Sequence, residues 1–256
     1  MKPVYIVSWL FALAISFVSC DDWLDKTPKD RLYPDVYFKT EDELRLFTNQ
    51  FYNNLVPSAV DIYSESSDLI VKSDLMLEMS GQRIIPDEGN GWNFTALRDI
   101  NFYLQYSHNC TEVNARNRYD GVARFFRAYF YFEKVKRYGD IPWYDKALDS
   151  DDPELYKARD SREFVMQKML EDLDFAIANL PKTKNAYVLT RWTALALKSR
   201  VCLFEGTFRK YHGLEDCEKY LNACVSASET FMNESGYTLY KSGSTPYRDL
   251  FASINL

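Results

Sequence analysis

Hydrophobic residues recur at helical spacing along most of this chain. One stripe consists of residues three or four apart, which share a helix face: Leu44, Phe47, Phe51 and Leu55. Thr40 and Glu43 form a capping-box pattern before the stripe, and Pro57 follows it. The pattern predicts an amphipathic helix from about Glu41 to Leu55.

Five further helices are predicted by the same spacing. They run from about Trp92 to Asn109, from Val122 to Tyr138, from a capping pattern at Asp160 and Glu163 to Pro181, from Thr190 through Phe204, and from Leu214 to Met232. In the segment that starts at Val122, Phe and Tyr leave little room for a polar face, so neighbours are expected on more than one side. Gly139 and Pro142 give that helix a stop signal.

Short connectors between helices of this length favour antiparallel pairs that stack on one another. We therefore predict an all-α fold, a tetratricopeptide-like α-solenoid of antiparallel helix pairs, although no clean repeat of about 34 residues can be aligned. A long irregular loop region is expected from Tyr63 to Gly91, because this segment holds Ser, Gly and Pro without a sustained period. Loops of this length are usually functional or disordered.

The composition is that of a folded protein that carries no broad basic surface. Hydrophobic residues make up 46% of the chain and aromatic residues 16%, whereas Gly occurs only 9 times, which disfavours a turn-rich all-β fold. Lys and Arg number 31 against 37 Asp and Glu, a formal net charge of -6. Because unspecific binding to nucleic acid needs a basic face, nucleic acid is not an expected partner.

The N-terminus has the pattern of an exported lipoprotein. An apolar run from Val4 to Val18 is too short to span a bilayer, which takes about 20 residues, and fits the core of a signal peptide. A small residue, Ser19, then precedes Cys20 and two aspartates. We predict a signal peptide over residues 1–19, lipidation of Cys20 and a helical domain over 20–256. An ordinary secretory signal or a buried N-terminal strand is the alternative.

The remaining cysteines do not predict a metal or disulfide site. Cys217 and Cys224 lie seven positions apart on one predicted helix, about 10.5 Å by helical rise, which is beyond disulfide reach. No CxxC occurs, and only His108 and His212 could join a zinc site. We expect the four cysteines to be small buried hydrophobic residues, with their redox state left open: Cys110, Cys202, Cys217 and Cys224.

Catalytic motifs are missing from the sequence. HExxH, GxSxG, the Walker loop and GxGxxG do not occur, and no pair of carboxylates is singled out among the 37 acidic residues. We therefore predict a protein that is not an enzyme and that needs no cofactor.

Family-specific motifs are distributed along the whole segment after Cys20. Phe126 to Phe132, followed by Arg137 to Pro142, resembles the RAxxYF and RYGDxP signature of SusD/RagB-type nutrient-uptake lipoproteins. Supporting matches are Cys20 to Asp25 with Pro28, Ser73-Asp74, Trp92 with Ile100-Asn101, Asp172 to Pro181, Ala194 to Arg200, and Gly236 to Tyr240 before Leu250-Phe251.

The resemblance implies a lipoprotein anchored on the outer face of the cell outer membrane. Such a protein binds glycan oligosaccharides or peptides without cleaving them and delivers them to a SusC-like TonB-dependent transporter. Members are usually about twice as long as this chain, so the resemblance covers the N-terminal half of the family. A truncated gene product or a fragment is therefore expected to keep its helix packing even if binding is lost.

Candidate ligand-binding residues come from the end of the irregular region. Sugar binding uses flat apolar rings together with amides, carboxylates or arginines, and the candidate set is Arg83, Asp87, Asn90 and Trp92. The competing interpretation is that Trp92 starts a helix and packs inward. Arg127 and Arg137 are expected to pair with carboxylates or helix ends and not with ligand.

Two alternatives to the binding lipoprotein stay open. One is a helical-repeat scaffold or a truncated, non-binding remnant of the family. The other, less favoured, is a lipid-anchored glycoside hydrolase, because surface carboxylates alone do not exclude one.

Overall fold

The computed structural model describes residues 36–56, 80–82, 84 and 91–252. The chain separates into two compact units, Met1–Tyr37 and Phe38–Leu256, and the helices below belong to the second. They are α3 (Glu41–Leu55), α6 (Thr95–Tyr106), α7 (Val113–Tyr138), α8 (Arg162–Asn179), α9 (Arg191–Tyr211), α10 (Cys217–Glu234), α11 (Pro246–Ala252) and the 3₁₀ turns η1 (Ser107–Asn109) and η2 (Pro153–Tyr156).

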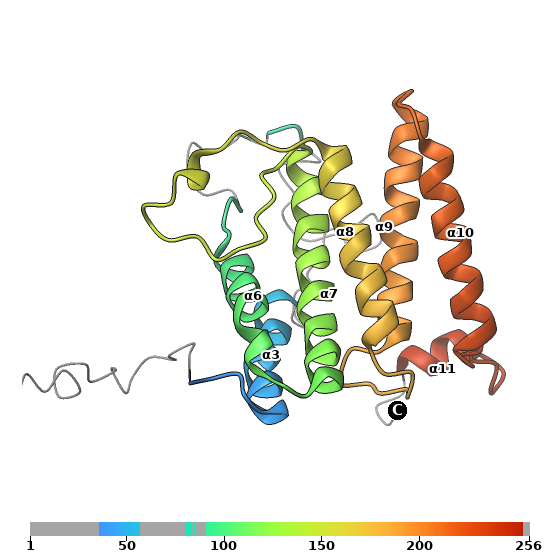
Figure 1. The fold of residues 1–256 in the computed structure, drawn as a ribbon. Coiled ribbons are helices and arrows are strands. Elements are labelled where there is room, and N and C mark those ends of the chain that lie inside the picture. Colours follow the sequence, from blue (N-terminus) through green and yellow to red (C-terminus); the bar gives the residue numbers. More distant parts are fainter. Residues whose placement is uncertain (1–35, 57–79, 83, 85–90, 253–256) are drawn as a thin grey trace, which may run out of the picture. The chain divides into compact units, whose positions relative to one another are not determined.

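The helices α7, α8, α9 and α10 stand side by side, each packed on the next (Figure 1). Arg127 in the middle of α7 pairs with Asp172, whereas Gly121, nearer the start of α7, lies against Ala176 and Leu180 at the end of α8. This order of contacts makes α7 and α8 antiparallel. Over the described residues the fold holds helices and a single isolated bridge, between Ile141 and Asp160. The predicted all-α, solenoid-type fold is confirmed.

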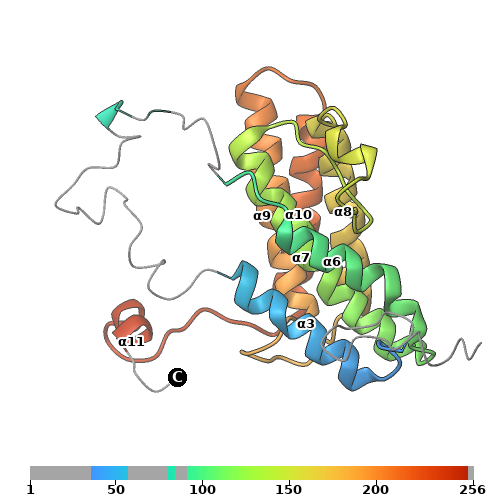
Figure 2. The same ribbon diagram turned by 90° about the vertical axis from the view of Figure 1, so that its left-hand side faces the viewer.

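Helix α7 is the central helix, as its aromatic pattern predicts. It packs against α3, α6, α8 and α9, and α3 and α6 lie over it in Figure 2. Six of its aromatic side chains are at most 6% exposed: Tyr119, Phe125, Phe126, Phe130, Tyr131 and Phe132. Tyr129, in the same predicted stripe, is only half-buried. Core packing, and not ligand contact, therefore explains most of the stripe.

The predicted start of α7 at Val122 is wrong, because the helix begins at Val113. The missed segment is rich in polar residues and contains Gly121, so its sequence shows no continuous stripe. It is helical nonetheless because Ala115 and Tyr119 are buried and Gly121 allows α8 to approach. A Cβ atom at Gly121 would lie 3.4 Å from Cγ of Leu180.

An aromatic cluster joins α3 and α6 to α7. Phe47 makes ring contacts with Phe38, Phe51 and Tyr103 at centroid distances of 5.0, 6.0 and 5.9 Å. Phe51 in turn meets Phe126 of α7 at 6.0 Å. Rings in such edge-on and stacked arrangements stabilise a fold beyond the effect of their buried area. The many Phe and Tyr residues of this chain thus form much of its core.

Side-chain caps fix several helix starts. The predicted capping box of Thr40 and Glu43 is present at α3. At α8, however, the cap is Ser161, whose Oγ accepts from the Phe164 amide at 3.3 Å. The prediction of a cap at Asp160 is wrong by one residue, because the Asp160 carboxylate accepts a hydrogen bond from the Trp143 amide instead.

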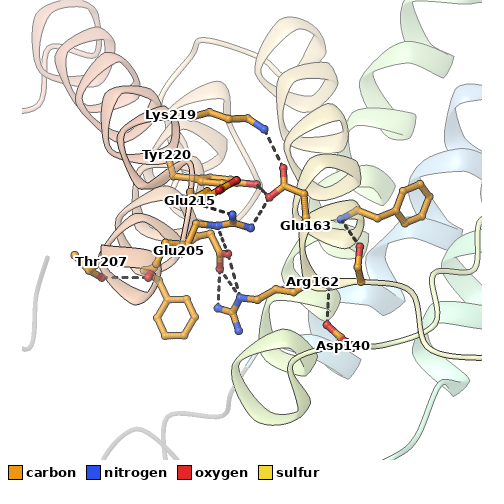
Figure 3. A network of polar contacts seen from close by, with 12 residues as sticks. Asp140, Arg162, Glu163, Glu205, Thr207, Glu215, Lys219 and Tyr220 are labelled. Atoms are coloured by element: carbon orange, nitrogen blue, oxygen red, sulfur yellow. Dashed lines mark hydrogen bonds and ion pairs between the residues drawn. The ribbon is translucent and has the colours of Figure 1, made fainter. Parts of the chain in front are cut away.

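A network of charged side chains joins α8, α9 and α10 (Figure 3). Glu205 of α9 is fully buried and accepts from Arg162 at 2.8 Å and from Arg209 at 2.8 Å. Arg209 also contacts Glu163, which accepts from Lys219 and Tyr220 of α10 at 3.0 Å each. A buried carboxylate is costly unless it is paired, so the two arginines are what allow Glu205 to lie here.

Two other predicted helices start later than their patterns indicate. The helix expected from Trp92 begins at Thr95, and the one expected from Leu214 begins at Cys217 after Asp216 in the left-handed conformation, with φ of 63°. The last helix, α11, was not predicted; Asp249 accepts from the Thr245 hydroxyl at its start. None of the described helices is long and apolar enough to cross a membrane.

The cysteines follow the prediction only in part. Cys110 and Cys202 are buried, but Cys217 and Cys224 are half-buried, and all four are free thiols. The prediction of four buried residues is therefore wrong for the two on α10, a helix whose only buried side chains are Tyr220 and Ala227. The signal peptide, Cys20 and most of the irregular region from Tyr63 to Gly91 lie outside the described residues.

Candidate functional site

A cavity of about 630 Å³ lies between the start of α6 and the long connection from α7 to α8, residues 139–161. Three aromatic side chains line it, Trp92, Phe94 and Tyr144. Its lining also includes four cationic side chains: Arg98, Lys146, Lys157 and Arg159. Concave sites that combine apolar rings with a few polar groups are the usual places where small ligands bind.

The wall formed by the connection is held by a buried amide on α6. Nδ2 of Asn101 donates to the carbonyl of Tyr144 at 2.8 Å and to that of Lys146 at 3.2 Å. Asn101 is 1% exposed, so these bonds are shielded from competing water. Further along, Nε of Arg98 donates to the carbonyl of Leu148 at 3.1 Å. Side chains of α6 therefore hold the connection in place by binding the main-chain carbonyls of the connection.

Arg127 of α7 supports Asn101 from behind. Its Nη1 donates to Oδ1 of Asn101 at 3.2 Å, and its Nε and Nη2 form two bonds to Asp172 at 2.6 and 2.8 Å. Burial alone would lower the pKa of Arg127, but the hydrogen bonds and charge of Asp172 raise it above its ordinary value. The prediction that Arg127 pairs with a carboxylate is confirmed. The guanidinium of Arg137 lies 5.8 Å from the ring centre of its neighbour Tyr138.

A second fastening comes from Tyr131 of α7. Its hydroxyl accepts from the Tyr144 amide at 2.6 Å and donates toward the carbonyl of Pro142 at 3.3 Å. Burial raises the pKa of Tyr131, which keeps the hydroxyl protonated and able to donate. Its ring also stacks on Trp143 with centroids 4.2 Å apart.

The far end of the connection is closed by Lys157 and Asp160. Nζ of Lys157 donates to the carbonyl of Trp143 at 2.6 Å and lies 3.0 Å from Oδ2 of Asp160. The same carboxylate oxygen accepts from the Trp143 amide at 2.7 Å. Lys157 and Asp160 thus bind the carbonyl and the amide of Trp143, which gives this part of the cavity wall a defined position.

Of the sequence-predicted site residues, the structure brings Trp92 to the cavity. Trp92 is 41% exposed and lies three residues before α6, so it neither starts the helix nor is fully packed inward. Its ring meets Phe94 and Tyr138 edge-on at 5.3 and 4.9 Å, and the guanidinium of Arg159 lies over it at 4.9 Å. The other three candidates, Arg83, Asp87 and Asn90, lie outside the described residues.

The cavity residues that the connection contributes were not predicted from the sequence. Tyr144, Lys146, Lys157 and Arg159 stand between two strong helical patterns and belong to no periodic stripe. The available signal was the density of aromatic and cationic residues after the Arg137 to Pro142 motif. That density alone does not show that the connection folds back onto α6.

The charges around the cavity are largely compensated. Hydrogen bonds to Glu154 and Asp152 raise the pKa of Lys146, and burial raises the pKa of Asp99. Asp99 is the one carboxylate among the described residues that line the cavity. No group of three or more His, Cys, Asp or Glu side chains in the described part of the chain is placed to hold a metal ion.

Fold and cavity together define an α-helical repeat protein with a ligand-sized site beside its central helix. A SusD-like family model, described as starch-binding and associating with the outer membrane, matches residues 52–191. The match covers more than half of the chain. This chain therefore belongs to the SusD/RagB family, and the resemblance noted in its sequence is confirmed.

Two curated relatives come from Formosa agariphila. SusD-like protein P38 is 25% identical over 226 residues, which make up 80% of this chain and 43% of the relative. SusD-like protein P2 is 27% identical over 218 residues, 77% of this chain and 43% of the relative. The chain thus spans less than half the length of the curated relatives that it matches.

Solved structures agree on the fold. A SusD-like protein of Bacteroides fragilis superposes with a TM-score of 0.60 at 22% identity, covering 84% of this chain and 42% of that one. NanU of B. fragilis gives a TM-score of 0.61 at 20% identity, with 83% and 46% covered. At these identities the likeness establishes the helical architecture.

Proposed function

We propose that this chain is a non-catalytic binding protein that captures nutrient oligosaccharides at the cell surface. In this proposal it is tethered to the outer membrane through a lipid on Cys20 and passes its ligand to a SusC-like TonB-dependent transporter. The observation that carries the proposal is the cavity, in which aromatic rings and hydrogen-bond donors converge in a member of a family described as starch-binding.

The chemistry of the lining suits a sugar. A pyranose ring has flat C–H faces that pack on aromatic side chains, and its hydroxyls accept hydrogen bonds from cations. Trp92 supplies a partly exposed ring, and Lys146 and Arg159 supply exposed donors. A laminarin-binding SusD-like protein shares the fold over 63% of this chain, with a TM-score of 0.50 and 19% identity.

The lining also supports binding without cleavage. A glycosidase needs two carboxylates, about 5 to 10 Å apart, on either side of the scissile bond. Among the described lining residues only Asp99 is a carboxylate. Ligand capture without hydrolysis is therefore the function that we propose, in place of a hydrolase.

Isothermal titration with a panel of oligosaccharides and peptides tests the proposal. We expect heat of binding with at least one oligosaccharide and no release of reducing ends on long incubation. Trp92→Ala should lose about 5- to 150-fold in affinity, since removing a stacking ring costs about 1 to 3 kcal/mol. Tyr187→Ala is the matched control, because Tyr187 is an aromatic residue that is 90% exposed and does not line the cavity.

Three results would count against the proposal. A cooperative melt without any binding heat would favour the scaffold or the non-binding remnant, and heat with peptides alone would replace the sugar by a peptide ligand. Released reducing ends would identify a hydrolase. Deleting the gene of the proposed SusC-like transporter and measuring uptake of the bound oligosaccharide tests the delivery step separately.

A further inference from the structure

The four cations of the cavity lining differ in what neutralises them. Three have acidic partners on the connection: Nη2 of Arg98 lies 3.9 Å from Asp149, Nζ of Lys146 lies 3.2 and 3.1 Å from Asp152 and Glu154, and Nζ of Lys157 lies 3.0 Å from Asp160. These partners lie outside the lining, so they hold the three cations without occupying the cavity.

Arg159 is the exception. Among the described residues, no carboxylate oxygen lies within 4.0 Å of its guanidinium nitrogens, and the side chain is exposed. Its guanidinium instead lies over the ring of Trp92, 4.9 Å from the centroid. A cation over an aromatic ring is held only weakly at an exposed site, so this contact can give way to a stronger partner.

The placement has a consequence for any sugar that stacks on Trp92. Phe94 and Tyr138 already contact the indole ring in T-shaped arrangements. The guanidinium of Arg159 lies over the ring, where a pyranose would stack. A neutral sugar must displace the guanidinium and gives it no charge in return. A sugar with a carboxylate can draw the guanidinium off the ring and pair with it through two parallel hydrogen bonds, which arginine forms better than lysine.

We propose that the preferred ligand is an acidic oligosaccharide of the uronic-acid type, with its carboxylate bound by Arg159 and its ring stacked on Trp92. This inference rests on the proposed function, because it assigns the charge of the ligand that the cavity captures. It also predicts that binding of the acid weakens as salt is added, since the ion pair is solvent-exposed and screened.

The test compares one sugar skeleton in two charge states. The full chain is titrated with a galacturonic acid trisaccharide and with the fully methyl-esterified trisaccharide, at low and high ionic strength. We expect the acid to bind about tenfold more tightly than the ester at low salt, in the range of a charge-assisted hydrogen bond. Raising the salt is expected to remove most of this difference and to leave the affinity for the ester unchanged.

Arg159→Gln is the decisive variant. It keeps a polar side chain but removes the charge, so it should bind acid and ester equally and lose about tenfold in affinity for the acid alone. Arg45→Gln is the matched control, because Arg45 is an exposed arginine on α3 that pairs with Asp42 and does not line the cavity. Circular dichroism melts of all variants check that the fold is retained.

The outcomes separate this inference from the proposed function. Equal binding of acid and ester by the wild-type chain would overturn the acidic ligand and leave oligosaccharide capture intact. A preference for the acid that survives in Arg159→Gln would overturn the assignment to Arg159. Binding of neither trisaccharide overturns this ligand assignment, and the wider oligosaccharide panel then decides whether the capture function fails as well.

Discussion

At the scale of single residues, two glycines set how closely neighbouring helices approach. Gly206 of α9 faces α10, where an added Cβ atom would lie 2.7 Å from Cγ of Leu221 and 3.1 Å from its backbone nitrogen. Gly121 of α7 faces α8, where the nearest atom, Cγ of Leu180, would be 3.4 Å away. Both lie inside helices, where glycine is unfavourable by about 1 kcal/mol relative to alanine. The two sites therefore differ in the space available for a Cβ atom, and this difference decides whether a change to alanine stabilises or destabilises the protein.

We predict that Gly206→Ala destabilises the protein by about 1 to 3 kcal/mol, because overpacking against α10 outweighs the gain in helix propensity. Gly121→Ala is the internal control and should be neutral or stabilising by up to about 1 kcal/mol. Urea denaturation followed by far-ultraviolet circular dichroism measures both. Equal stability of the wild type and Gly206→Ala would show that α10 shifts at no cost.

At the scale of elements, Glu163 of α8 connects this helix to α9 through Arg209 and to α10 through Lys219 and Tyr220. Burial alone would raise its pKa, but hydrogen bonds from Lys219 and Tyr220 and the charges of Arg209 and Lys219 lower the pKa below its ordinary value of 4.5. A lowered pKa in the folded state means that Glu163 contributes stability above its unfolded pKa. This contribution is lost as the pH falls through the lower folded pKa.

Glu163→Gln is therefore expected to lower the melting temperature at neutral pH and to have little effect well below pH 4, where the wild-type carboxylate has also lost its charge. Glu171→Gln is the control on the same helix, because Glu171 makes only an exposed pair with Lys168. Thermal melts across this pH range provide the measurement. A constant difference between wild type and Glu163→Gln at all pH values would contradict the argument.

Sequence patterns predicted elements well wherever one helix face is continuously apolar. The caps at Thr40 and Thr190 and the stop at Gly139 follow from local chemistry, and the structure places helix ends there. The start of α7 was missed because residues 113–121 are helical through tertiary contacts: Tyr119 reaches Glu41 of α3, and Gly121 lies against the end of α8. The cavity was missed for a related reason: Asn101 reaches the carbonyl of Tyr144, 43 residues along the chain, and no local pattern encodes such a contact.

At the scale of the whole molecule, the chain covers 43% of each of two curated relatives and 42% of a solved SusD-like protein. The described part of this chain contributes aromatic rings and cations to the cavity, so binding can be measured on this chain. Attachment to the membrane is a separate property, because the predicted lipidation site, Cys20, precedes the helical unit that starts at Phe38.

Cys20→Ala is expected to abolish lipidation and release the protein from membranes, because an acyl chain contributes about 0.8 kcal/mol per buried methylene. Fractionation of cells that express the variant, with detection by antibody, measures the release. Cys217→Ser, which removes a half-buried thiol elsewhere, should stay in the membrane fraction. Unchanged fractionation of Cys20→Ala would rule out the lipid tether.

The fastening of the α7–α8 connection has a consequence for how such a binding site diversifies. Asn101, Tyr131 and Lys157 form hydrogen bonds to main-chain carbonyls and amides of the connection, and the side chains of Lys146 and Arg159 take no part in these bonds. Exchanging Lys146 or Arg159 for another residue leaves these anchors in place. The main chain of the connection thus keeps its position while the side chains that line the cavity can change. A new ligand preference can therefore arise by point substitution without a change in the fold of the connection.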